Sequence, residues 1–189
     1  MPRLFTALEV PHNIASSLSL VRGGLPGARW LENGDLHITL NFFGDVEAHI
    51  ADEIVHALDR VELPCFNLRL RGLDVFTRKK PSTLYAGLEA NPALMTLHET
   101  IGRKLRHLPL ERNKRSFTPH ITLAHVRQSK IHDLIKYLTE RGGFLTDTFE
   151  AKRFVLMSSR ELVGGGPYII EESWPLHQSV MAVKAATAL

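Results

Sequence analysis

The tetrapeptide His-Ile-Thr-Leu occurs twice in the sequence, at residues 37–40 and again at residues 120–123. Residues i and i+2 of a β-strand point to the same face, so each copy presents one histidine together with one threonine. These side chains are His37, Thr39, His120 and Thr122. An unperturbed imidazole has a pKa of about 6.5, so one histidine can act as a general base while the other acts as a general acid. The threonine hydroxyls can donate to phosphoryl oxygens where negative charge develops. The pattern suits transfer at phosphorus, and this division of labour needs no metal ion.

The two motifs belong to a longer repeat. Residues 4–9 return, loosely, as residues 84–89, an offset of 80 positions. The motif histidines are 83 positions apart, and so are the strand-like segments 66–71 and 149–154. Near-constant offsets over such a length indicate a duplicated unit with a small insertion. The duplication favours a functional role, because a single His-x-Thr on a strand often does nothing more than pack there.

Hydrophobic patterns predict the same order of elements in each copy: strand, helix, strand, helix, strand. The strands alternate apolar with polar or small residues, and the helices carry apolar side chains at helical spacing. Pro92 is expected in the first turn of a helix, where its missing N–H costs little. The expected strands are residues 4–10, 35–43 and 66–76 in copy one, 84–89, 118–126 and 149–157 in copy two, and a last strand at about 168–174.

This order of elements, joined by short turns, predicts an α+β fold. We expect two similar lobes related by pseudo-twofold symmetry, with antiparallel sheets lining a central cleft and helices outside. Residues 1–178 should form one bilobal domain, because no Gly/Ser-rich or proline-rich linker separates the copies. The lobe-forming repeats span about 3–78 and 83–161, the C-terminal strand spans 167–175, and residues 179–189 form a tail.

Composition bears on location and partners. A hydrophobic share of 44% with 23% charged residues is ordinary for a soluble globular protein. The sequence has no apolar run of about 18 residues, the length that a membrane-spanning helix needs. The first strand-like segment begins near Arg3, so we expect no signal peptide. Cys65 is the only cysteine, which suits a reducing compartment, so we expect a cytoplasmic protein, and a monomer.

Basic residues gather between the copies and ahead of the second motif. They could form a rim that attracts phosphate, or simply a solvated surface, and charge alone does not separate the two interpretations. These residues are Arg78, Lys79, Lys80, Arg103, Lys104, Arg106, Arg112, Lys114 and Arg115.

With its flanks included, the repeated motif resembles that of the 2H phosphoesterase superfamily, named for its two His-x-Thr motifs. The likeness is greatest to the bacterial and archaeal RNA 2′,3′-cyclic phosphodiesterases, historically called 2′-5′ RNA ligases. It covers most of the chain and rests on these segments: 3–11, 29–30, 36–44, 117–124, 166–168 and 174–176.

The resemblance implies a bilobal fold with a central cleft, no metal or other cofactor, and RNA ends or small cyclic nucleotides as substrates. It also implies roles for the motif residues. His37 would donate a proton to the leaving oxygen, His120 would activate water, and Thr39 and Thr122 would hold the phosphate. The implied reaction opens a terminal 2′,3′-cyclic phosphate on RNA to a 2′-phosphomonoester.

The sequence departs from the family pattern at one position. Members usually carry an arginine five residues after the second motif histidine, where this chain has His125. Simple alternation puts position 125 on the opposite face from His120, and a bulge would be needed to bring it back. Arg127 is the expected substrate-binding cation in its place. The departure bears on substrate affinity more than on the type of reaction.

Three alternatives remain open at this point. A metal hydrolase is conceivable with ten histidines, but the sequence has no His-x-His, His-x-x-x-His or Asp/His cluster with ligand spacing. A non-catalytic RNA-binding module would account for the basic residues but not for two intact motifs. Ligation of RNA ends through a 2′-5′ bond would be the same site run in reverse.

Overall fold

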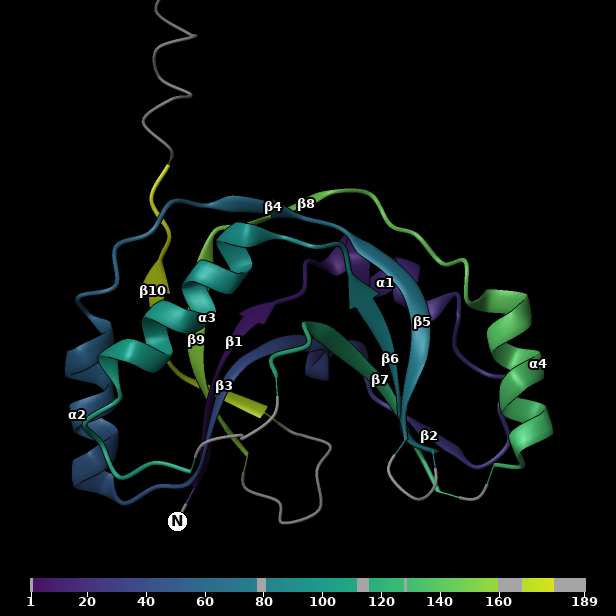
Figure 1. Ribbon diagram of the computed structural model, residues 1–189, viewed down its shortest axis with the longest axis horizontal. Helices are drawn as coiled ribbons and strands as arrows, with labels where there is room; N and C mark the ends of the chain where they lie inside the picture. The colour runs from purple at the N-terminus through teal and green to yellow at the C-terminus, as the bar shows by residue number, and fades with distance from the viewer. Residues whose placement is uncertain (1, 78–80, 112–115, 128, 160–167, 179–189) are drawn as a thin grey trace, which may run out of the picture.

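The computed structural model (Figure 1) describes residues 2–77, 81–111, 116–127, 129–159 and 168–178. Helices and antiparallel strands are mixed along the chain, which confirms the predicted α+β class. The strands are β1 (Arg3–Glu9), β2 (Ala28–Trp30), β3 (His37–Asp45), β4 (Phe66–Leu68), β5 (Leu70–Thr77), β6 (Pro81–Leu88), β7 (His120–Val126), β8 (Phe149–Ala151), β9 (Arg153–Ser159) and β10 (Tyr168–Pro175). The helices are α1 (His12–Ser19), the 3-10 turn η1 (Asn33–Asp35), α2 (Ala48–Leu58), α3 (Pro92–Lys104) and α4 (Ile131–Arg141).

The duplication is visible in the order and breaks of these elements. α3 begins at Pro92, as predicted, and the Asn91 side chain caps it by accepting a hydrogen bond from the Leu94 backbone N–H. The strands predicted at 66–76 and 149–157 are each broken in two, at Arg69 and at Lys152. The breaks occur at equivalent positions of the two repeats. They allow β4 and β8 to form a separate two-stranded sheet while β5 and β9 join the main one.

The main sheet has eight strands, in the order β10-β9-β1-β3-β7-β6-β5, with β2 paired to β7. In one half, β1 of the first repeat pairs with β9 of the second. In the other half, β6 of the second repeat pairs with β5 of the first. The repeats therefore exchange their last strands, and neither half of the sheet is built from one repeat alone. We expected repeats 3–78 and 83–161 each to form one lobe. The observed pairing differs, because each half of the sheet contains strands of both repeats.

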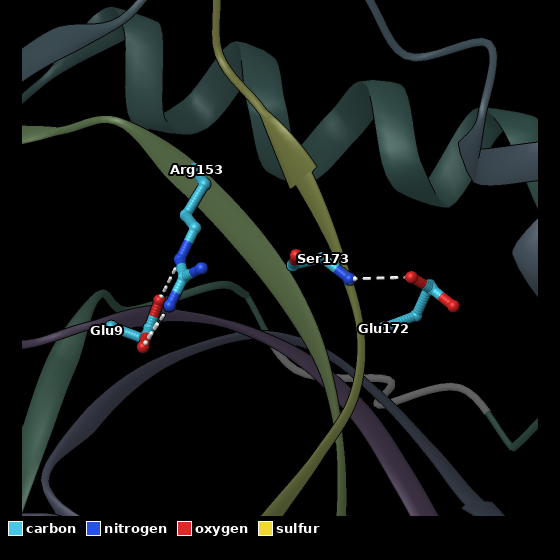
Figure 2. Close-up of polar contacts among 4 residues, drawn as sticks. All are labelled: Glu9, Arg153, Glu172 and Ser173. Carbon is cyan, nitrogen blue, oxygen red and sulfur yellow. Dashed lines mark hydrogen bonds and ion pairs between the residues drawn. The ribbon is translucent and has the colours of Figure 1, made fainter.

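An ion pair spans one of these exchanged pairings. Arg153 on β9 donates hydrogen bonds of 2.5 and 2.9 Å to the two carboxylate oxygens of Glu9 on β1 (Figure 2). Because a guanidinium matches a carboxylate in this two-pronged geometry, the contact favours the observed register of the two strands. It lies at the end of β1 that is paired with the start of β3.

The two halves of the sheet meet where β3 pairs with β7, through Ile38 and Ile121. Both isoleucines are fully buried in the main hydrophobic core. In Figure 1, α2 and α3 lie beside the β9-β1-β3 half, and α4 lies beyond β5 at the other end; α3 packs against β3, and α4 against β5. The apolar faces of the helices thus cover one face of the sheet, which leaves polar residues of β3 and β7 on the other.

Some predictions fall outside the described residues. These are the tail 179–189 and the basic residues Arg78, Lys79, Lys80, Arg112, Lys114 and Arg115. Within the part of the chain that the structure describes, no helix is long and apolar enough to span a membrane. The limits of the predicted domain, 1–178, stay a prediction.

Candidate active site

The pairing of β3 with β7 brings both His-x-Thr motifs to one place. Ile38 is directly opposite Ile121 in the antiparallel register, and both side chains point into the core. Because side chains alternate along a strand, the flanking histidine and threonine of each motif point to the other face. Because antiparallel strands run in opposite directions, Thr39 lies beside His120 and His37 beside Thr122. The four polar groups therefore gather on adjacent strands, with each histidine next to the threonine of the other motif.

Each histidine is oriented by the backbone two residues before it. The Nδ1 atom of His37 lies 2.8 Å from the carbonyl oxygen of Asp35, and that of His120 lies 2.7 Å from the carbonyl oxygen of Thr118. A carbonyl can only accept, so Nδ1 carries the proton in both rings. The Nε2 atoms are then available, either to take a proton or, when protonated, to give one.

Aromatic rings pack around both imidazoles in equivalent ways. The ring of His37 lies 5.0 Å from Phe5 and 4.7 Å from Tyr168, between ring centroids. His120 lies 4.7 Å from Phe76 and 5.3 Å from Tyr85. These rings restrict the movement of each imidazole and exclude water from its faces.

Burial among these rings lowers the pKa of both histidines. For His37 desolvation is the largest cause; the hydrogen bond to Asp35 and the charge of its carboxylate oppose it, and the charge of His120 adds to it. For His120 desolvation is again the largest cause, opposed by the hydrogen bond to Thr118. In the free site both pKa values are below 6.5, so both rings are mainly neutral at pH 7.

A β-bulge follows each motif and changes which later residues reach the site. Thr122 pairs with Tyr85 and Ala124 pairs with Leu84, so Leu123 is an extra residue in β7. The bulge reverses the alternation after it. His125, which simple alternation puts on the opposite face from His120, lines the same cavity as His120 and Thr122.

The equivalent bulge in β3 is at Leu40, between the pairs Ala7–Thr39 and Thr6–Asn41. It brings Phe42, 40% exposed, to the site at the position equivalent to His125. The fifth residue after each motif histidine thus reaches the site in both repeats. It is a phenyl ring in the first repeat, Phe42, and an imidazole in the second, His125.

Arg127 lies two residues beyond His125 and is exposed. It does not line either of the two cavities next to the motifs. On the neighbouring strand, Arg29 is directly opposite His125. Desolvation lowers the pKa of His125, and the charges of Arg29 and Arg127 lower it further, so both arginines lie close to that imidazole. His125 is thus a neutral hydrogen-bonding group with two cations beside it, and Arg127 is at the rim of the site.

Two adjoining cavities surround the motif side chains. The larger, of about 770 Å³, is lined by His120, Thr122 and His125, among others. The smaller, of about 160 Å³, is lined by His37 and Arg3, among others. Thr39 and Phe42 line both cavities, so the two form one continuous site. Among the described residues, no group of three or more His, Cys, Asp or Glu side chains could hold a metal ion.

Several residues of the site were missed by reasoning from sequence. Phe5 and Tyr85 occupy equivalent positions in the repeat, which was a signal that both could support the motif histidines. Phe42 reaches the site only because of the bulge in β3, which simple alternation does not predict. His125 reaches it through the kind of bulge that its position required. Asp35 stands where the second repeat has Thr118, and this difference gives only His37 a neighbouring carboxylate.

Comparison with known proteins identifies the family and agrees with this fold. The model of the 2′-5′ RNA ligase superfamily matches residues 11–161, and the chain belongs to that family. An RNA 2′,3′-cyclic phosphodiesterase of Aeropyrum pernix is 28% identical over 173 residues, which cover 90% of this chain and 93% of the relative. A protein of the same name from Thermotoga maritima is 32% identical over 133 residues, 66% of this chain and 70% of the relative.

Solved structures share the fold. E. coli LigT in complex with 3′-AMP superposes with a TM-score of 0.79 at 24% identity, covering 94% of this chain and 100% of LigT. The protein TT0787 of Thermus thermophilus gives a TM-score of 0.79 at 23% identity, covering 93% of this chain and 98% of its own. The exchanged strands and central pairing described above therefore belong to an arrangement that other chains also adopt.

Proposed function

We propose that this protein hydrolyses the terminal 2′,3′-cyclic phosphate of RNA to a 2′-phosphomonoester, using two histidines and no metal ion. The names of the Aeropyrum and Thermotoga relatives support the substrate class. The observation that carries the proposal is the pairing of Ile38 with Ile121, because it brings two histidines and two threonines onto one face of adjacent strands. One phosphate in this position can be contacted by all four side chains.

The reaction needs one base and one acid. The neutral Nε2 of His120 takes a proton from water as the water oxygen bonds to phosphorus. The bond from phosphorus to the ribose 3′ oxygen breaks, and protonated His37 gives its Nε2 proton to that oxygen. The hydroxyls of Thr39 and Thr122 donate to the non-bridging oxygens, whose negative charge grows in the transition state.

His37 is the better candidate for the acid, because the carboxylate of Asp35 favours its charged form. The equivalent residue beside His120 is Thr118, which has no charge. A bound cyclic phosphate is an anion, and its charge raises the pKa of both imidazoles toward neutrality. Arg127, with Arg29 beside it, contributes at the rim by attracting the RNA backbone.

The direct test is turnover of an oligoribonucleotide ending in a 2′,3′-cyclic phosphate, with excess EDTA present. We expect conversion to the 2′-phosphomonoester with an undiminished rate, since two imidazoles supply both proton transfers. Chromatography against synthetic 2′- and 3′-phosphate standards identifies the product. Loss of activity with EDTA and recovery with Zn²⁺ or Mn²⁺ would instead support a metal hydrolase. Tight binding of the oligonucleotide without turnover would support an RNA-binding module.

The pH dependence of kcat/KM should be bell-shaped, with its optimum on the acid side of pH 6.5. The activity rises with pH as the base loses its proton and falls as the acid loses its proton, and burial lowers both pKa values from 6.5. Initial rates at substrate concentrations far below KM measure this profile. An optimum on the alkaline side of neutrality would contradict the assignment of both limbs to these histidines.

Asp35→Asn identifies which limb belongs to which histidine. The variant keeps the backbone carbonyl that accepts from His37 but removes the carboxylate that raises its pKa. The descending limb, which reports the acid, should therefore move to lower pH, while the ascending limb stays in place. Movement of the ascending limb alone would make His37 the base.

A further inference from the structure

Arg3 is a cation at the site. The sequence did not predict it as a site residue, and it has no role in the proton transfers proposed above. It is on β1, where alternation puts it on the same face as Phe5. Phe5 packs against His37, and Arg3 lines the smaller cavity together with His37 and Thr39. Among the described residues that line the two cavities, Arg3 is the only arginine or lysine. An anionic substrate that fills the smaller cavity would therefore meet this guanidinium.

The guanidinium has hydrogen-bonding capacity to spare. Its Nε atom is buried and has no hydrogen-bond partner among the described residues. The carboxylate of Asp45 forms a long ion pair with Arg3, at 3.6 Å from Nε, which is too far for a good hydrogen bond. The side chain as a whole is 38% exposed, so part of it remains open to a ligand. Arginine binds phosphate through two parallel N–H donors, and a buried donor without a partner is costly.

The position of Arg3 fits a second phosphate better than the one that reacts. Arg3 is two positions before Phe5, which is about 7 Å along β1. The ring of Phe5 in turn lies 5.0 Å from the ring of His37. Between them, Phe5 and Phe42 are paired across β1 and β3 and line the same cavity. A ribose resting on these rings would have its cyclic phosphate at His37 and its 5′ oxygen toward Arg3.

We propose that Arg3 binds the phosphodiester on the 5′ side of the terminal nucleotide, so that the enzyme prefers RNA ends to cyclic mononucleotides. This inference rests on the proposed hydrolysis of cyclic phosphates and names the part of the substrate that sets its selectivity. A nucleoside 2′,3′-cyclic phosphate has no group for Arg3 to bind. An oligonucleotide, or a mononucleotide that carries a 5′-phosphate, supplies one.

The test compares two substrates that differ only in that group: 2′,3′-cyclic AMP, and the same compound with a 5′-phosphate. The measured quantity is the ratio of their kcat/KM values. We expect the wild-type protein to favour the 5′-phosphorylated compound, and Arg3→Gln to reduce this preference by about tenfold to a hundredfold, the usual worth of a charge-assisted hydrogen-bonded pair. Arg3→Lys should retain part of the preference, because it keeps the charge but not the two parallel donors.

Two further variants test whether the effect of Arg3→Gln comes from its contact with the 5′-phosphate. The alternatives are the loss of net charge and the loss of the ion pair with Asp45. Arg71→Gln removes the same charge from a similar ion pair, since Arg71 lies 3.8 Å from Glu89 and lines neither cavity. Asp45→Asn removes the ion pair with Arg3 but keeps the guanidinium. Both should keep the wild-type ratio of kcat/KM values. Added salt should reduce the preference of the wild-type protein, and should have less effect in Arg3→Gln.

Each other outcome has a distinct meaning. Equal losses on both substrates in Arg3→Gln would mean that Arg3 supports the fold or the reacting phosphate, and would overturn the inference. An unchanged ratio would overturn it as well. If Arg29→Gln abolished the preference and Arg3→Gln did not, the 5′-phosphate would lie at the β2–β7 side instead. Failure of the wild-type protein to hydrolyse either substrate would contradict the proposed function itself, which distinguishes that result from all the others.

Discussion

Replacing His120 with alanine should lower kcat for cyclic-phosphate RNA by roughly 10²–10⁴-fold, and replacing His37 should cost a similar factor. Each imidazole carries out one proton transfer, and its own motif has no other histidine that could replace it. The double variant should be only slightly less active than the less active of the two single variants, because the two residues act in one step. Steady-state kinetics with an oligoribonucleotide substrate measures all three.

Folding must be shown to survive these changes. Neither imidazole belongs to the hydrophobic core, so circular dichroism spectra and the two-state unfolding transition should stay close to those of the wild type. His56→Ala is a matched control, since the Nδ1 atom of His56 also lies 2.8 Å from a backbone carbonyl, that of Asp52, but on the exposed side of α2. Near wild-type turnover in His37→Ala or His120→Ala would remove that residue from the mechanism.

Replacing Thr39 or Thr122 with valine should lower kcat by roughly 10²–10³-fold with a smaller change in KM. Valine has nearly the shape of threonine but cannot donate to the non-bridging oxygens, whose charge is greatest in the transition state. Thr39 lines both cavities, whereas Thr122 lines only the larger, so the loss should be at least as great for Thr39→Val. The split between kcat and KM is the decisive measurement.

Serine at the same positions provides the control. Thr39→Ser and Thr122→Ser keep the hydroxyl and lose only a methyl group, so both should retain most of the activity. If valine and serine variants were equally impaired, the methyl packing would matter more than the hydroxyl, and the proposed role in stabilising the transition state would be wrong. If the valine variants changed KM alone, the threonines would bind the ground state and the transition state equally.

Local features of the sequence were enough to predict the elements and the motifs. The alternation around Ile38 and Ile121 depends only on neighbours along one strand, and so predicted which side chains point inward. The helix start at Pro92 is also a local property, because an N-cap and a first turn are satisfied within a few residues. The constant offset of 83 positions predicted that both motifs would sit in equivalent strands, which is what β3 and β7 are.

Tertiary structure alone decided how the strands pair and what the site contains. The exchange of β5 and β9 between repeats depends on long-range hydrogen bonds, and both pairings are compatible with the same sequence alternation. The bulge at Leu123 appears only against the partner strand β6, and it brings His125 into the site while leaving Arg127 at the rim. Desolvation lowers the pKa of both motif histidines because rings from separate strands surround them. A pattern along one strand records which face a residue occupies, whereas register, burial and charge at the site are properties of the segments packed around it.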